Sequence, residues 1–293
     1  MIPSSLLVRL PNHLGDTLMT LPALDRLSSA GCALTLLGKG WARSLLAAHR
    51  WPVHAVPAGL GAGVAQWRDL AARTGSPRAL LFTNSFGTAL TARLAGLKAS
   101  GYATEARRWL LAHPVPVPAR WHADMHTAEY YDALAAAVLH EPARPVPPVE
   151  LRLEPRAHAQ ARALLAGAGV PETYVVLCPG ATGRHRGREK AWPDFARLTR
   201  WLLARGERVV ALPGPGERAR FEQVLPGAVV LPEADVAAFG ALLAGSRLVI
   251  ANDSGPGHLA AAVDARLVSL FGVTEVEKTR PWGRRVTVVG SAA

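Results

Sequence analysis

Short apolar runs alternate with helical stretches along the whole chain, and no other feature of the sequence limits the possible folds as much. In the first half, apolar runs at Ser5–Leu10, Ala33–Gly38, Val53–Val56 and Ala79–Thr83 are separated by segments with apolar residues at helical spacing. Strands that alternate with helices pair in parallel, because each helix carries the chain back across the sheet. The sequence therefore predicts an α/β fold with a doubly wound parallel sheet.

The alternation is interrupted once, by five prolines between Glu141 and Pro155. Segments this rich in proline are typical of linkers between domains. Because the alternation restarts beyond it, we expect two domains, residues 1–150 and residues 151–293. The carboxyl ends of parallel strands are where such sheets bind ligands, so we expect both sheets to face one cleft.

The spacing of apolar residues gives approximate bounds for the other elements. In the first half the expected helices are Trp41–His49, Val64–Thr74, Gly87–Leu94 and Asp124–Leu139, and His113–Ala119 is an extended connection. In the second half the expected strands are Tyr174–Leu177, Arg208–Leu212, Val229–Leu231 and Leu248–Ala251, and the expected helices are Arg156–Ala166, Pro193–Arg205, Glu217–Val224, Val236–Ala244 and Leu259–Val263.

Charge and composition narrow the class of partner. The 293 residues include 33 Lys and Arg against 22 Asp and Glu, a net charge of +11 that favours nucleotides, phosphorylated glycolipids, an anionic membrane surface or nucleic acid as partners.

No apolar run approaches the ~20 residues of a spanning helix, and the first residues do not resemble a signal peptide, so we expect a cytoplasmic protein. Cys32 and Cys178 have no metal-site or disulfide spacing, so we expect buried thiols.

A polar, glycine-rich turn follows the predicted strand Leu248–Ala251. Asp253 or Ser254 could cap the helix that follows, and Gly255 and the glycine two residues later allow backbone N–H groups to approach a ligand, with His258 close by. This geometry suits a phosphate. It is also compatible with an ordinary capped turn, so a phosphate site is indicated only if the neighbouring segments also carry groups that bind phosphate.

A second turn of the same domain is expected at the same sheet edge. Gly180, Ala181 and Thr182 follow the strand Tyr174–Leu177, and the basic segment from Arg184 to Lys190 comes next. Helix N-termini, a hydroxyl group and a cation together indicate a pyrophosphate site better than any one of them does. Most of these arginines are expected to be solvated, and Lys190, beside Trp192, is the cation most expected to be fixed.

In the first domain, polar groups follow two predicted strands. Asp16 begins the helix after Ser5–Leu10, where it either caps that helix or lies at the ligand-binding edge, and the sequence does not choose between these roles. Asn84 and Ser85 follow the strand Ala79–Thr83. His126, with two tyrosines nearby, begins a helix that lines a cleft or packs on the sheet.

Several common catalytic motifs are absent from the sequence. There is no GxGxxG after the first strand of either domain, no P-loop, no GxSxG nucleophile elbow and no metal-ligand cluster. A dinucleotide dehydrogenase and a P-loop phosphotransferase are therefore disfavoured.

Four segments together resemble glycosyltransferase family 9, and within it the ADP-heptose:lipopolysaccharide heptosyltransferases, the type II enzymes above all. They occur in the family's order over nearly the whole chain. The segments are VRLPNHLGDTLMTLPAL (Val8–Leu24), TNSFGTALTARLAG (Thr83–Gly96), CPGAT with the later KAWP (Cys178–Pro193) and NDSGPGHLAAA (Asn252–Ala262).

The resemblance implies a GT-B fold of two Rossmann-like domains and a reaction that inverts the anomeric centre in one displacement, with no metal and no cofactor. Asp16 matches the general base of the family, and Lys190 and Thr182 match residues that hold the departing diphosphate. The remaining donor contacts that the resemblance implies are Glu217, Asp253, Ser254, Gly255 and His258, with Ala234 and Asp235 beside the adenine.

The resemblance also implies the partners. The C-terminal domain would bind ADP-L-glycero-β-D-manno-heptose, and the N-terminal domain would bind a lipid A inner core that carries Kdo and a first heptose. Such an enzyme works at the cytoplasmic face of the inner membrane as a peripheral protein, and nucleic acid is not expected as a partner. The residues expected to contact the acceptor are Asn12, His13, Asn84, Ser85 and His126.

Two other functions stay open at this point. One is a family member that uses another nucleotide sugar for a surface glycan, and the segment between Gly180 and Lys190, longer and more basic than the family's usual spacer, is compatible with it. The other is a binding protein for nucleotide or glycolipid that has lost turnover. Asp16 argues against the second, because a pure binder has no use for a base.

Overall fold

A computed structural model describes residues 3–104, 106–180, 184–185, 188–189 and 191–290. The chain forms two compact units, Met1–Pro147 and Pro148–Ala293, and the division falls inside the proline-rich segment. Among the described residues, no helix has both the length and the apolar character needed to cross a membrane.

Six parallel strands form the sheet of the first unit, in the order β3-β2-β1-β4-β5-β6. Strand β1 is central, because it pairs with β2 on one side and with β4 on the other. The strand order reverses between β1 and β4, and open α/β sheets bind ligands at such a reversal. The strands are β1 (Ser5–Arg9), β2 (Ala33–Gly38), β3 (Val53–Ala55), β4 (Arg78–Leu81), β5 (Lys98–Tyr102) and β6 (His113–Val115).

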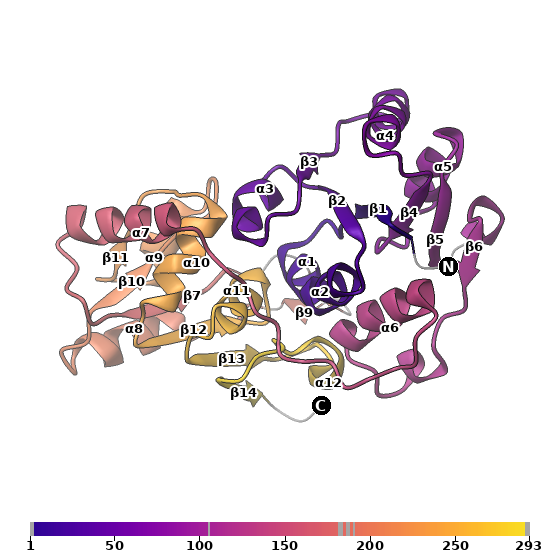
Figure 1. The fold of residues 1–293 in the computed structure, drawn as a ribbon. Helices are drawn as coiled ribbons and strands as arrows, with labels where there is room; N and C mark the ends of the chain where they lie inside the picture. Colours follow the sequence, from indigo (N-terminus) through magenta and orange to yellow (C-terminus); the bar gives the residue numbers. More distant parts are fainter. Residues whose placement is uncertain (1–2, 105, 181–183, 186–187, 190, 291–293) are drawn as a thin grey trace. The chain divides into compact units, whose positions relative to one another are not determined.

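Helices cover both faces of this sheet, with α1, α2 and α6 on one face and α4 and α5 on the other (Figure 1). Thr20 separates α1 from α2, and Pro22 lies in the first turn of α2. The helices are α1 (Leu14–Met19), α2 (Leu21–Ser29), α3 (Ala42–Leu45), α4 (Leu60–Thr74), α5 (Phe86–Leu94) and α6 (Thr127–Leu139), with the 3-10 helices η1 (Ala47–His49), η2 (Arg107–Leu110) and η3 (Ala119–His122).

The second unit repeats the same topology. Its sheet has the order β11-β10-β7-β12-β13-β14, with β7 central and the reversal between β7 and β12. The strands are β7 (Val175–Cys178), β10 (Val209–Ala211), β11 (Val229–Val230), β12 (Leu248–Asn252), β13 (Leu267–Phe271) and β14 (Val286–Gly290), and β8 (Arg184–His185) and β9 (Arg188–Glu189) form a separate antiparallel pair.

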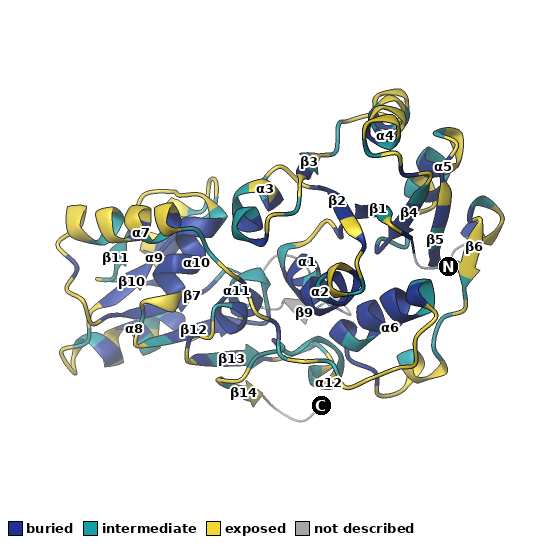
Figure 2. Ribbon diagram, viewed as in Figure 1, coloured by how far each residue is buried: buried dark blue, intermediate teal, exposed yellow. Residues whose placement is uncertain are grey.

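Helices α8 and α9 pack on one side of the second sheet, where Phe195, Leu202 and Phe221 meet Val175 and Leu177. Helix α10 packs against α7 and α11. The central strands of both sheets are buried except at the first residue of β1, β4 and β12, which explains why they contain mostly apolar residues (Figure 2). The helices of this unit are α7 (Pro155–Gly167), α8 (Phe195–Leu203), α9 (Arg218–Val224), α10 (Val236–Ala244), α11 (Gly255–Ala262) and α12 (Val276–Thr279).

The predicted α/β class with two doubly wound parallel sheets is confirmed, but some local predictions were wrong. The connection expected at His113–Ala119 contains the strand β6, which tolerates Pro114 because an edge strand need not pair every N–H group. Part of the basic segment forms the β8–β9 pair. Helix α11 begins at Gly255 rather than at Leu259, and α6 begins at Thr127 rather than at Asp124.

Both cysteines are buried and free, as expected. Burial raises the pKa of the Cys178 thiol to about 12 and also raises the pKa of Cys32. The thiolate is the reactive form, so neither side chain is suited to nucleophilic chemistry at neutral pH.

A buried arginine joins α2 to α6 and to the end of the first unit. Arg26 forms an ion pair with Asp132 at 2.6 Å, and it donates to Glu141 at 2.9 Å and to the carbonyl oxygen of Pro142 at 2.7 Å. Burial raises the pKa of Asp132, and the charge of Arg26 opposes this rise. Through its bonds to Glu141 and Pro142, Arg26 therefore attaches the first residues of the proline-rich segment to the first unit.

We predict that Arg26→Met destabilises the first unit by about 3–5 kcal/mol, because it leaves the Asp132 carboxylate buried without its cation. Without Arg26, which now lowers the pKa of Asp132, this pKa should rise further. A raised folded-state pKa adds stability at low pH that is lost as the pH rises, so the loss caused by the substitution should be smaller at pH 5 than at pH 8. Urea unfolding at both pH values measures this. The control is Arg73→Met, which removes an exposed pair with Asp69 and should cost less than about 1 kcal/mol; equal losses would contradict the prediction.

Candidate active site

The strand-order reversal of the first unit is flanked by the residues that follow β1 and β4. Asp16 lies in the first turn of α1, is half-buried, and shares a hydrogen bond with the hydroxyl group of Tyr131 on α6. Burial first, and then the charge of Asp16, raises the pKa of Tyr131 well above its usual range. Tyr131 therefore stays protonated and acts as the donor to the Asp16 carboxylate.

The backbone after β1 is held by a buried arginine. Arg9 donates to the carbonyl oxygen of Leu10 and, at 2.6 Å, to Oδ1 of Asn12. Burial lowers the pKa of Arg9. Asn12 and His13 are both exposed, so the polar groups predicted to contact an acceptor are accessible at this sheet edge.

The segment after β4 is fixed by Arg107, a residue that the sequence analysis did not single out. The Arg107 side chain is fully buried and donates to the carbonyl oxygens of Tyr102 (2.7 Å) and Thr83, and to Oδ1 of Asn84 (3.1 Å). Asn84 in turn donates to the hydroxyl group of Tyr130 at 3.0 Å. The only signal for this residue in the sequence is that two arginines, 107 and 108, are adjacent. That pattern does not show which of the two is buried.

Ser85 and His126 both occupy helix N-caps. Ser85 Oγ accepts a hydrogen bond from the Thr88 N–H group at 3.3 Å, and the residue is exposed. His126 is almost fully buried, and its Nδ1 accepts from the Ala128 N–H group at 3.0 Å within a capping box with Glu129. The local structure thus accounts for His126 as a cap, whereas Ser85 is accessible at the edge of the sheet.

In the second unit, Asn252 joins the two sides of the strand-order reversal. This residue ends β12 and is fully buried. Its Nδ2 donates to the carbonyl oxygen of Pro179 at 2.8 Å, and its Oδ1 accepts from the Trp192 N–H group at 3.0 Å. One amide side chain therefore holds both ends of the segment 179–192. Thr182 and Lys190 belong to that segment but lie outside the described residues.

The turn after β12 leads directly into α11. Ser254 is the N-cap residue, but its hydroxyl group donates to the carbonyl oxygen of Asn252 at 3.1 Å and accepts no capping bond from an N–H group of the helix. Asp253 is buried and accepts from the Thr274 hydroxyl group at 2.6 Å. The side-chain cap that was one expectation for Ser254 is therefore not formed, and the Asp253 carboxylate bonds to Thr274. Gly255 opens the first turn of α11, and His258 follows one turn later in buried surroundings.

Two glycines lie close to neighbouring groups beside this turn. A Cβ atom on Gly257 would lie 3.3 Å from the carbonyl oxygen of Asn252, so a larger residue here would crowd the end of β12. A Cβ atom on Gly180 would lie 3.4 Å from Glu217 Oε1. The other carboxylate oxygen, Oε2 of Glu217, accepts from the Gly214 N–H group at 2.9 Å. The structure thus brings Glu217 next to the segment that follows β7.

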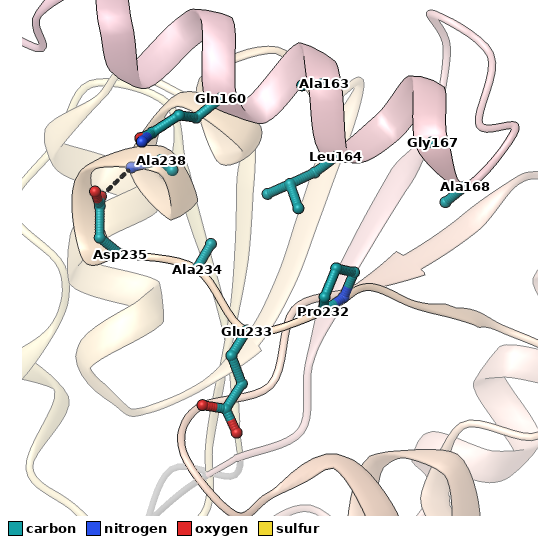
Figure 3. A pocket seen from close by; sticks show the side chains of 10 residues that line it. All are labelled: Gln160, Ala163, Leu164, Gly167, Ala168, Pro232, Glu233, Ala234, Asp235 and Ala238. Carbon is teal, nitrogen blue, oxygen red and sulfur yellow. Dashed lines mark hydrogen bonds between the residues drawn. The ribbon is translucent and has the colours of Figure 1, made fainter.

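A pocket of about 550 Å³ lies between α7 and the segment that precedes α10 (Figure 3). Its lining is mainly apolar and includes Leu164, Pro232 and Ala234. Asp235 stands at its edge, where its Oδ1 accepts from the Ala237 and Ala238 N–H groups at 2.9 and 2.8 Å. Both of the residues that the resemblance places beside the adenine therefore line this pocket.

The described residues contain no group of three or more His, Cys, Asp or Glu side chains placed to hold a metal ion. The chemistry available to the described part of the chain is that of a carboxylate at each sheet edge, helix N-termini and hydrogen-bonding side chains.

Comparison with known proteins identifies relatives of this chain. It matches the family model Glycosyltransferase family 9 (heptosyltransferase) over residues 67–293. It is 36% identical over 147 residues to lipopolysaccharide heptosyltransferase 3 of Escherichia coli, an alignment that covers 45% of this chain and 41% of that protein. It is also 36% identical over 137 residues to lipopolysaccharide heptosyltransferase 1 of Pseudomonas aeruginosa, with 44% and 37% covered. The matched stretch spans about two fifths of the length of these curated relatives.

The fold is similar to a solved structure of E. coli ADP-heptose lps heptosyltransferase II. The TM-score is 0.81 at 23% sequence identity, and the match covers 97% of this chain and 90% of that one. Together with the two parallel sheets, this likeness confirms the predicted GT-B fold.

We predict that Asn252→Ala lowers the free energy of unfolding of the second unit by about 2–4 kcal/mol, because the buried carbonyl group of Pro179 and the partly buried N–H group of Trp192 lose their partner. Thermal unfolding followed by circular dichroism measures this. Ser254→Ala is the matched control from the same turn, and it should cost about 1 kcal/mol or less. A loss for Asn252→Ala no larger than that of the control would show that the side chain does not hold the segment.

Proposed function

The chain belongs to glycosyltransferase family 9, and from this membership we propose that it transfers a heptose from ADP-L-glycero-β-D-manno-heptose to the inner core of lipopolysaccharide. The observation that carries the proposal is the match of residues 67–293 to the family model, which includes the whole second unit. The proposed acceptor is a lipid A precursor with Kdo and a first heptose.

We place the ADP moiety at the carboxyl edge of the second sheet. The N-terminus of α11, at Gly255, supplies backbone N–H groups and a positive dipole end to a phosphate, and Gly180 lets the segment after β7 approach closely. Glu217 is positioned beside Gly180 to accept hydrogen bonds from ribose hydroxyl groups. The apolar pocket beside Ala234 has room for a purine.

Thr182 and Lys190 are proposed as further contacts of the diphosphate, and this part of the proposal rests on the sequence alone. A lysine beside the diphosphate neutralises the charge that develops as the leaving group departs, and this is the main electrostatic task of such a site. Asp253 and Ser254 hold the turn, since their side chains bond to Thr274 and to the backbone of Asn252. We propose no cofactor and no metal.

In the chemical step, we propose Asp16 as the general base. Its carboxylate takes the proton of an acceptor hydroxyl group while that oxygen bonds to the anomeric carbon. The bond from this carbon to the diphosphate oxygen breaks, and the electron pair leaves with ADP, so the centre is inverted. Tyr131 orients the carboxylate by its hydrogen bond, and the exposed Asn12, His13 and Ser85 are available to the acceptor together with Asn84.

We propose that the protein is cytoplasmic and works as a peripheral protein on the inner membrane, because the acceptor is anchored there. The net charge of +11 supports contact with an anionic lipid surface and with a phosphorylated acceptor. Nucleic acid is not a proposed partner. A family member with a different nucleotide sugar is the second candidate, and the basic segment 184–190 is the observation that favours it.

Calorimetric titration with ADP, UDP, GDP and dTDP tests the donor. We predict that ADP binds at least tenfold more tightly than the other three, because the pocket beside Ala234 selects the base. Turnover of ADP-heptose on heptose-deficient core lipid in the same preparation then tests the reaction. Tighter binding of another nucleotide would indicate a family member that builds a different surface glycan from another nucleotide sugar. Absence of nucleotide binding would favour a binding protein without catalytic activity.

We predict that Asp16→Asn lowers kcat by about 10²–10⁴ and leaves the ADP dissociation constant unchanged, because only the base is lost. Tyr131→Phe keeps the base and loses its hydrogen-bond partner, so kcat should fall less, by about tenfold. Steady-state turnover and calorimetry measure the two quantities. The exposed Asp69→Asn is the control and should match the wild type. Near-normal turnover of Asp16→Asn with saturating acceptor would exclude the assigned base.

A further inference from the structure

One tryptophan of the first unit is exposed to an unusual degree. Trp109, on the 3-10 helix η2, is 85% exposed, whereas Phe86 and Leu94 on the neighbouring helix α5 are 47% and 46% exposed. Among the described residues, no other large apolar side chain reaches the exposure of Trp109. Exposing an indole ring to water is unfavourable, and the support and the neighbours of this ring determine what it can bind.

The structure presents Trp109 on a fixed support. Arg107, two residues earlier, is fully buried and donates hydrogen bonds to three acceptors, among them the carbonyl oxygen of Tyr102 at 2.7 Å. On the other side, Leu110 packs against the core cluster that contains Ala89 and Ala92 of α5. η2 is thus anchored on both sides of the indole, and the exposure of Trp109 does not come from a loosely attached loop.

The turn that leads into η2 is strained. Ala106 has a φ angle of 58°, in the left-handed region that costs a residue with a Cβ atom about 1 kcal/mol or more. The N–H group of Arg107 donates to the carbonyl oxygen of Thr104 at 3.0 Å across this turn, and strain of this kind is concentrated at functional sites.

η2 also lies at the ligand-binding edge of the sheet. It follows the carboxyl end of β5, and Phe86 follows the carboxyl end of the neighbouring strand β4. Arg107 donates to Thr83 and to Asn84, which belong to the segment assigned to the acceptor. The exposed indole and the acceptor segment therefore belong to one connected piece of structure.

The chemistry of this surface fits a lipid interface better than a protein. An indole combines an apolar ring with an N–H donor, which is why tryptophan is enriched where hydrocarbon meets water. The exposed Arg108 stands beside it, with its guanidinium carbon 5.8 Å from the ring centre, and the chain carries a net charge of +11. One indole and a half-exposed Phe86 supply far less than the ~1,000 Å² that a stable protein interface buries.

We propose that η2, through Trp109 and Arg108, docks the first unit on the surface of an anionic lipid bilayer. The indole enters the region between headgroups and acyl chains, and the guanidinium group of Arg108 binds lipid phosphate. An apolar anchor and a basic group together give reversible peripheral binding. The inference rests on the proposed function, because a membrane-anchored acceptor needs its binding segment held near the bilayer.

Co-sedimentation with vesicles of phosphatidylethanolamine and phosphatidylglycerol tests the proposal with the full-length protein. Trp109→Ala should bind these vesicles about tenfold more weakly than the wild type, since it removes the side chain that enters the interface. Trp109→Phe keeps an apolar ring and should recover most of the binding. Added salt should weaken wild-type binding, because the contact of Arg108 is electrostatic.

Trp201→Ala is the matched control. Trp201 lies on α8 of the second unit, is 50% exposed, and has the guanidinium carbon of Arg205 3.7 Å from its ring centre, so it is also a tryptophan beside an arginine. We expect its vesicle binding to equal that of the wild type. Equal binding by Trp109→Ala and wild type, an equal loss in both tryptophan variants, or no vesicle binding by the wild type would each overturn the proposal.

Turnover on an acceptor oligosaccharide without acyl chains separates this inference from the proposed function. Trp109→Ala should retain wild-type turnover on that acceptor, because Trp109 does not take part in the reaction. Loss of vesicle binding with retained turnover supports both proposals. If no variant turns over heptose but vesicle binding still depends on Trp109, the proposed function fails and the docking surface stands.

Discussion

A parallel sheet that is buried on both faces leaves its strands mostly apolar and presents accessible polar side chains chiefly where its strands end. Both units of this chain meet that constraint with the same strand order, in which the first strand is central and the order reverses beside it. The reversal separates the helices that follow neighbouring strands, so the carboxyl edge opens at one place in each unit. Asp16 lies at that place in the first unit, and Asn252 with the start of α11 lies there in the second.

Buried polar side chains hold these edges in shape. Asn252 fixes both ends of the segment 179–192, and Arg107 fixes the segment after β4 from a position more than twenty residues away. In each case one buried side chain bonds to two backbone groups, so the cost of burying it is offset by the hydrogen bonds that it makes. Each edge therefore presents its exposed groups from a fixed support within its own unit.

The class of the fold could be predicted from the sequence because the alternation of apolar runs and helices depends on local patterns. Strands such as β6 could not, because Pro114 disfavours a strand unless the strand lies at an edge, and the edge is a property of the whole sheet. The same limit applies to the site. Asp16 and the turn after β12 stand out in the sequence, whereas Arg107 and Tyr131 acquire their roles only through contacts between elements distant in the chain. The sequence also could not show that His126 is buried and caps α6, because burial depends on the packing of α6 in the whole unit, and its contact with the acceptor stays a prediction.

The central claim is that the carboxyl edge of the second sheet binds the diphosphate of an ADP-sugar. A crystal structure of the protein with ADP tests this claim most directly. The account predicts diphosphate density at the first turn of α11, within hydrogen-bond distance of the Gly255 backbone, with the ribose beside Glu217. Diphosphate bound away from α11, with the segment after β7 and Glu217 making no contact with the nucleotide, would contradict it.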